Sequence, residues 1–171
     1  MESGVLNLYL KLSETLEEMT KLYRQLLEVV RLEKQTLIDV NLSEIENARH
    51  QKEIFIDKIR IYDLMREKYA QNLGAAMGIN STSPRLLELA RMMPLEEGDH
   101  LRQLHSSLEM LIKRIQELNR ENETYAQSAL KALNGALGNI KETLSGKKTY
   151  QRKGQYQSGP DNSGHFVSKE A

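Results

Sequence analysis

The sequence lacks or has few of the residues that usually stabilise a small extracellular fold, namely cysteine, large aromatic residues and proline. It contains no cysteine and no tryptophan, and only two phenylalanines and three prolines among 171 residues. Without cysteine there are no disulfides and no thiolate metal ligands, which is typical of a protein in a reducing compartment. Few helix breakers and few bulky aromatics favour a single domain built from long, water-exposed helices.

The chain also lacks net charge and long apolar runs. Its 24 Lys and Arg residues balance 24 Asp and Glu residues, so nothing attracts it generally to nucleic acid or to an anionic membrane. No apolar run approaches the roughly 18 residues that cross a bilayer. The N-terminal stretch has no basic segment of a signal peptide. The sequence therefore predicts a cytoplasmic protein without nucleic-acid binding or stable membrane insertion.

Helical periodicity dominates the first half of the chain. Apolar residues recur every three or four positions over residues 5–40 and again over residues 44–73, which predicts two long helices. The short connection makes them antiparallel neighbours. Ser43 and Glu46 match a capping box that opens the second helix.

Three charged residues interrupt the apolar seams of these two helices. Glu33 takes a seam position near the end of the first helix, and we interpret it as a frayed or solvent-facing end. Lys52 and Arg66 fill two gaps in the second helix. Their long stems can lie along an apolar groove while their charges stay in water.

Two further helices are predicted. Gly74 or Gly78 ends the second helix, and Ser83 caps a short helix that has Pro84 at its first position. A very long helix then covers residues 96–145. The fold class is all-α: an extended antiparallel helical bundle of two long helices, a short helix and a very long C-terminal helix.

The seam of this long helix changes character halfway. It begins with six large residues at spacings of three and four, a pattern typical of helix packing: Leu101, Leu104, Leu108, Leu111, Ile115 and Leu118. The same positions then become polar and small: Asn122, Tyr125, Ala129, Ala132 and Ala136. A lone Asn on such a seam often fixes register, and we expect this role for Asn119 and Asn122.

Helix length indicates what the second half of this seam does. About 50 residues span roughly 75 Å, whereas the first helix reaches only about 54 Å, so we expect the far half to project beyond its neighbours. Its face ends in Leu133, Leu137, Ile140 and Leu144. Gly135 and Gly138 weaken this segment by about 1 kcal/mol each relative to Ala, and small residues let another helix approach closely. The face is predicted to bind a partner helix or, alternatively, to close a homodimer.

The pattern collapses after Leu144, which divides the chain into a helical domain, residues 1–145, and a flexible tail, residues 146–171. The tail is rich in Gly, Ser, Gln and Lys, and should be disordered alone. It nevertheless carries Tyr150, Tyr156 and Phe166, and isolated aromatics of this kind often anchor linear motifs.

No catalytic or metal-binding pattern stands out, so we predict that the protein is not an enzyme and has no cofactor or metal. His100 and His105 are five residues apart and do not share a helix face as a metal pair would. His50 lies in a polar stretch, where phosphotransfer is a distant alternative. The carboxylates alternate with Lys and Arg, which is typical of a solvated helix surface.

The chain resembles the FlgN family of flagellar type III export chaperones. The resemblance rests on Leu118-Asn119-Arg120-Glu121-Asn122 followed by Gln127-Ser128-Ala129-Leu130, which is similar to the family's L-N-x-x-N element and the helix after it. The hairpin around Lys34-Gln35-Thr36-Leu37-Ile38-Asp39 and the tail segment Thr149-Tyr150-Gln151-Arg152-Lys153-Gly154 also resemble family elements.

The resemblance implies an all-helical cytoplasmic chaperone. Such a chaperone binds the C-terminal helices of hook–filament junction proteins, prevents their premature assembly and delivers them to the export gate. The resemblance places client binding on residues 119–144, with these candidates: Asn119, Asn122, Tyr125, Ala129, Leu133, Ala136, Leu137, Ile140 and Leu144. It places docking to the cytoplasmic domain of the gate on Tyr150 and Gly154.

Overall fold

The computed structural model describes residues 3–79 and 81–144, and within them it contains four helices and no strand. These are α1 (Ser3–Ile38), α2 (Leu42–Ala76), α3 (Leu86–Met92) and α4 (Leu95–Leu144). The all-α class, the order of the helices and the length of the last helix are as the sequence predicted. The predicted tail lies outside the described residues.

The chain divides into two units, Met1–Gln127 and Ser128–Ala171, and the boundary falls inside α4. The first unit holds α1, α2, α3 and the first two thirds of α4. The described part of the second unit is the last stretch of α4, residues 128–144. The two units are described separately below.

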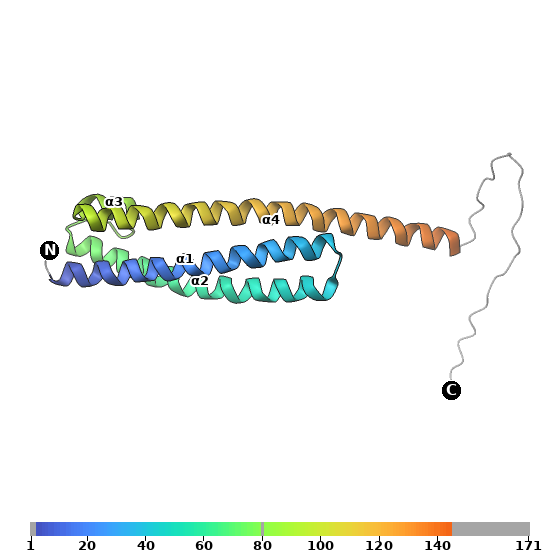
Figure 1. Cartoon of the computed structure of the whole chain (residues 1–171), viewed down its shortest axis with the longest axis horizontal. Coiled ribbons are helices and arrows are strands. Elements are labelled where there is room, and N and C mark those ends of the chain that lie inside the picture. Colours follow the sequence, from blue (N-terminus) through green and yellow to red (C-terminus); the bar gives the residue numbers. More distant parts are fainter. Residues whose placement is uncertain (1–2, 80, 145–171) are drawn as a thin grey trace, which may run out of the picture. The chain divides into compact units, whose positions relative to one another are not determined.

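Within the first unit, α2 and α4 both share apolar clusters with α1, and α1 and α2 cross each other along their length (Figure 1). The hairpin turn makes α2 antiparallel to α1. In contrast, α4 runs parallel to α1, because Tyr9 bonds to His100 at 3.0 Å near one end and Asn122 donates to the Val30 carbonyl at 3.0 Å near the other. This position explains why α1 buries residues on more than one face.

The core of the first unit consists of two apolar clusters along α1. One joins Leu12 and Leu16 to Leu73 of α2, Leu89 of α3 and Leu101 of α4, and all five side chains are fully enclosed. The other cluster lies further along α1 and contains these residues: Leu22, Leu26, Leu27, Val30, Ile59, Ile115 and Leu118. The predicted Leu and Ile seam of α4 is therefore confirmed as core, with Leu111 half-buried.

Glycine ends α2 as the sequence predicted, and the residue is Gly78. Its φ of +79° allows the Ile79 amide to donate to the Gly74 carbonyl at 2.8 Å, and the Gly78 amide to donate to Ala75 at 3.1 Å. This pair of bonds is a Schellman motif, which satisfies carbonyls that the end of a helix leaves unpaired. Ala75, Gly74 and Gly78 thus stop the helix before the loop that leads to α3.

Two predicted helix starts are wrong by a few residues. The side chain of Asn41, not Ser43, caps α2 and accepts a bond from the Glu44 amide at 3.3 Å. Helix α3 begins after Arg85 and not at Ser83, and no side chain caps it. Pro84 instead packs against Gly74, where an added Cβ would lie 3.0 Å from the proline ring.

The interpretation of Glu33 as a frayed or solvent-facing end is wrong. Its side chain is 14% exposed and accepts two bonds from the Lys52 ammonium at 2.8 and 3.0 Å. The Lys52 ammonium also donates to Asn119 at 3.1 Å, and Asn122 donates to Glu33 at 2.8 Å. These four residues, here called the polar network, connect α1, α2 and α4. Lys52 therefore does not extend its charge into water, since its side chain is only 20% exposed.

Removing one partner of the polar network should destabilise the first unit more than removing both charges. Lys52→Met leaves the Glu33 carboxylate shielded from water without its cation, and we expect a loss of about 1–2 kcal/mol in the free energy of unfolding. The double variant Glu33→Gln, Lys52→Met should recover more than half of this loss. Urea denaturation of the unaltered chain, the two single variants and the double variant measures the difference. A double variant as unstable as the sum of its single variants would contradict the pairing.

Candidate functional site

The last stretch of α4 carries an exposed apolar stripe. Its members follow one another at spacings of three and four, which places them on one side of the helix: Leu130, Leu133, Leu137, Ile140 and Leu144. Each of these side chains is at least 55% exposed, and Leu144 reaches 82%. Leucines at the same spacing earlier in α4, such as Leu101, are fully buried. We call these five residues the α4 stripe.

An exposed stripe of this kind indicates an interaction surface, because leucines on a soluble helix are normally buried against something. The described residues 128–144 contain no buried position, and only Ala129 is half-buried. The predicted residues Leu133, Ala136 and Leu137 are all exposed. Leu130 lies on the face that the sequence predicts to project, and its exposure places it in the stripe, although the list of candidate client-binding residues omits it.

The two glycines of this stretch lie on the other side of the helix. Gly135 is two residues from both Leu133 and Leu137, and two residues turn an α-helix by roughly 200°. An added Cβ at Gly135 or Gly138 would have no atom within 4 Å. The glycines therefore do not make room for a helix on the α4 stripe. Their remaining effect is to lower the helix propensity of the stretch that carries it.

The structure brings Asn119 and Asn122 into the polar network and not onto an open face. Asn122 is 4% exposed and donates to the Val30 carbonyl and to Glu33. Asn119 is half-buried and accepts a bond from Lys52. This arrangement favours the interpretation of both residues as fixing the register of the helices. A clue was present in the sequence, because Glu33 and Lys52 are opposite charges at seam gaps of neighbouring helices.

Tyr125 marks the edge of the first unit on α4. It is 42% exposed, and the Lys34 ammonium of α1 lies 5.6 Å from the centre of its ring, within the range of a cation–π contact. Lys34 also forms an ion pair with Glu121. The hydrogen bond between them raises the pKa of Lys34 and lowers the pKa of Glu121, so both stay charged near neutral pH.

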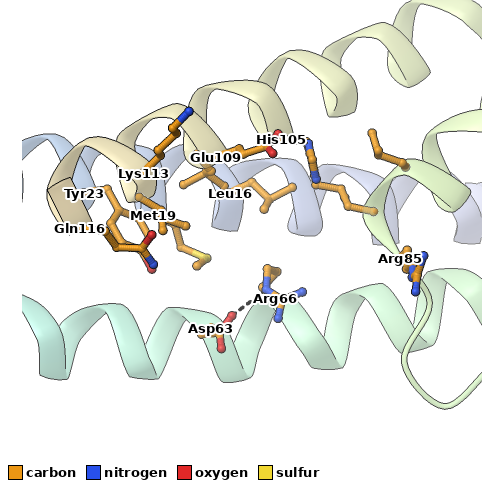
Figure 2. A pocket seen from close by; sticks show the side chains of 14 residues that line it. Leu16, Met19, Tyr23, Asp63, Arg66, Arg85, His105, Glu109, Lys113 and Gln116 are labelled. Carbon is orange, nitrogen blue, oxygen red and sulfur yellow. Dashed lines mark hydrogen bonds and ion pairs between the residues drawn. The ribbon is translucent and has the colours of Figure 1, made fainter.

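A second candidate surface is a groove of about 860 Å³ in the first unit, shown in Figure 2. Leu16, Met19 and Tyr23 of α1 form its floor, and α2 and α4 supply polar side chains at its sides. Asp63 is paired with Arg66 at 2.7 Å. The groove thus presents an apolar floor and no arrangement of nucleophile, base and orienting group that would support catalysis.

The histidines do not gather into a metal site in the part of the chain that the structure describes. His100 contacts Tyr9 and lies 3.4 Å from Glu17, and His105 lies 3.8 Å from Glu109. His50 is exposed on α2. Residues 3–79 and 81–144 contain no group of three residues that could hold a metal ion. None of the four described helices has the length and apolar character needed to cross a bilayer.

These observations define a class of protein: a helical bundle protein with a run of five exposed aliphatic side chains on its last helix. The comparison with protein families then identifies the particular family. The family model described as FlgN protein matches residues 1–158, and the chain belongs to the FlgN family. FlgN proteins are a chaperone family, and the chain is therefore a flagellar export chaperone. No curated protein and no solved structure matches it.

Replacing the two glycines should stabilise the helix that carries the α4 stripe. Gly135→Ala and Gly138→Ala each add about 1 kcal/mol of helix stability, and neither new methyl group meets another atom. Amide hydrogen exchange over residues 128–144 should slow by about fivefold per substitution. Gly4→Ala, at an equally open position in α1, is the matched control and should leave these amides unchanged. Unaltered exchange in the Gly135 and Gly138 variants would contradict this explanation.

Proposed function

We propose that the protein is a cytoplasmic chaperone that binds the C-terminal helices of flagellar hook–filament junction proteins through the α4 stripe. The observation that carries this proposal is the run of exposed aliphatic side chains from Leu130 to Leu144 in a chain of the FlgN family. An amphipathic client helix laid on this stripe would bury both apolar faces at once. Masking the client in this way prevents its premature assembly, and it requires no chemistry.

The residues of the proposed site have different roles in binding the client. Leu130, Leu133, Leu137, Ile140 and Leu144 supply the apolar area, and Ala129 and Ala136 flank them with small side chains. Tyr125 adds an aromatic contact at the edge of the first unit. We assign Asn119 and Asn122 a supporting role, because their amide groups already hold α4 against α1 and α2.

The weak helix propensity around Gly135 and Gly138 fits a chaperone that must release its client. A segment that becomes fully ordered only on binding spends part of the interaction energy on ordering, so its affinity is lower for the area it buries. Delivery to the export gate requires such release. We further propose that Tyr150 and Gly154, outside the described residues, dock the chaperone on the cytoplasmic domain of the gate.

A charge placed on the α4 stripe should abolish client binding and leave the bundle intact. Leu137→Glu removes the burial of a leucine, about 1.5–3 kcal/mol, and adds the desolvation of a carboxylate, so affinity should fall at least 100-fold. Leu133→Glu should behave in the same way. Titration calorimetry with a purified hook–filament junction protein measures the affinity.

The control for this experiment is Asn139→Glu, which adds the same charge two residues from Leu137 on the other side of the helix. It should bind the client nearly as well as the unaltered chain. Thermal unfolding of the first unit should shift by less than about 0.5 kcal/mol in each variant. A large loss of stability in Leu137→Glu would mean that the stripe is internal core.

The alternative is that the same stripe closes a homodimer in a structural coiled-coil or adaptor protein. The exposure of the stripe is compatible with this role, and sedimentation separates the two. A monomer that forms a one-to-one complex with the client supports the chaperone proposal. A stable dimer that Leu137→Glu converts to a monomer, together with no client binding, supports the alternative.

Replacing the tail tyrosine should separate client binding from delivery. Tyr150→Ala should bind the client with unchanged affinity and bind the cytoplasmic domain of the export gate at least tenfold more weakly, since it removes an aromatic anchor. Tyr156→Ala serves as the matched control. A pull-down in which the Tyr150 variant retains normal gate binding would remove Tyr150 from the proposal.

A further inference from the structure

We propose that the turn between α1 and α2 is a second docking surface for the client and binds an apolar segment flanked by Lys or Arg. The surface consists of Ile38, Val40 and Leu42 and is called the hairpin tip below. The inference rests on the proposed client-binding function and extends it to a part of the first unit that the sequence did not predict to bind the client.

The first observation is exposure. Turns between helices normally carry polar residues, yet Ile38, Val40 and Leu42 are 48%, 63% and 77% exposed. Three exposed aliphatic side chains thus lie within the five residues of this turn. Asn41 alone supplies the polar cap that α2 needs. The neighbouring side chains therefore have no evident part in forming the turn.

The second observation is the strained backbone of Val40. Among the described residues Val40 is the one non-glycine residue with positive φ, at +52°. The Asn41 amide donates to the Thr36 carbonyl at 3.1 Å, and the Val40 amide donates to Leu37 at 3.4 Å. This is the same pair of bonds that ends α2, where Gly78 takes the place that Val40 takes here. A β-branched residue is disfavoured at this position, whereas glycine or asparagine fits it.

The comparison of Val40 with Gly78 shows that this chain can end a helix in the unstrained way. Strained backbone persists where another requirement outweighs it, and such positions cluster at functional sites. At the hairpin tip the exposed side chain of Val40 is what glycine would lack. We infer that an apolar contact made by this side chain is the reason for the strain.

The third observation is the chemistry around the tip. The carboxylates of Asp39 and Glu44 form no ion pair with any described residue, and the Asp39 carboxylate accepts hydrogen bonds from the Gln35 amide. An apolar surface edged by two unpaired carboxylates complements an apolar segment with basic residues at its borders. A second copy of this chain would bring the same two carboxylates together and is therefore the poorer fit.

The fourth observation links the tip to the proposed client site within the first unit. Lys34, one helical turn before Ile38, pairs with Glu121 of α4 and lies over the ring of Tyr125. Ile38 thus lies one turn of α1 beyond Lys34, the residue that contacts Tyr125. A client helix that packs on Tyr125 is brought to the part of the first unit that carries the tip.

Two substitutions test the inference with opposite effects on stability and binding. Val40→Asn relieves the strain and removes the apolar side chain, so its thermal midpoint should rise by roughly 2–5 °C while client affinity falls about tenfold. Leu42→Gln should weaken binding to a similar extent without raising the midpoint. The probe is the purified hook–filament junction protein, measured by titration calorimetry with the full chain.

Leu64→Gln is the matched control, because Leu64 is 69% exposed on α2 and lies outside the hairpin tip. It should bind the client like the unaltered chain. Asp39→Asn should reduce the salt dependence of the client affinity, which a purely structural turn would not do.

The outcomes separate this inference from the proposed function. If Val40→Asn and Leu42→Gln bind normally while Leu137→Glu loses binding, the hairpin tip is not a docking surface and the α4 stripe stands. If Leu137→Glu also binds normally, the proposed function itself fails. If the tip variants change only the sedimentation of the chaperone alone, the tip is a contact between copies of this chain, and the inference is overturned.

Discussion

The ion pair between Glu33 and Lys52 lies at the end of the apolar core of the first unit, just after Val30 on α1. Both charges are largely shielded from water, so they must face each other, and only one register of α1 and α2 allows this. Asn119 and Asn122 extend the constraint to α4 through bonds to Lys52, Glu33 and the Val30 carbonyl. The large seam residues of α4 thus give way to polar ones at the point where α1, α2 and α4 are held together by hydrogen bonds.

Helix α4 carries its apolar residues in two different environments. Up to Leu118 its seam residues pack into the two apolar clusters of the first unit and stabilise the fold, whereas the aliphatic residues from Leu130 onward are exposed. Burial against the protein's own helices stabilises the bundle, whereas the exposed stripe is the surface that we propose for the client of this FlgN-family chain. The two glycines lower the helix propensity of the segment that carries the stripe.

The sequence predicted the helices well because their information is local. The spacing of Leu101, Leu104 and Leu108 defines a buried seam without knowledge of the partner helix, and positive φ at Gly78 follows from the residue type. The sequence predicted the environment of Glu33 wrongly, because a charged residue at a seam position can have either of two environments. It faces water if the helix ends there, or it meets an opposite charge if another helix supplies one. Lys52 decides between them, and the two residues are 19 positions apart.

By itself, the sequence determined the four helices, the apolar seams and the change in character of the last helix, since periodicity and propensity depend on neighbours along the chain. Only the tertiary structure decided which polar residues are internal and which apolar residues stay exposed. Asn122 is buried because Val30 and Glu33 stand opposite it, and Val40 is strained because bonds to the end of α1 hold the turn. Burial and strain of this kind depend on groups that are distant in sequence or fixed by the fold, and a one-dimensional pattern does not contain them.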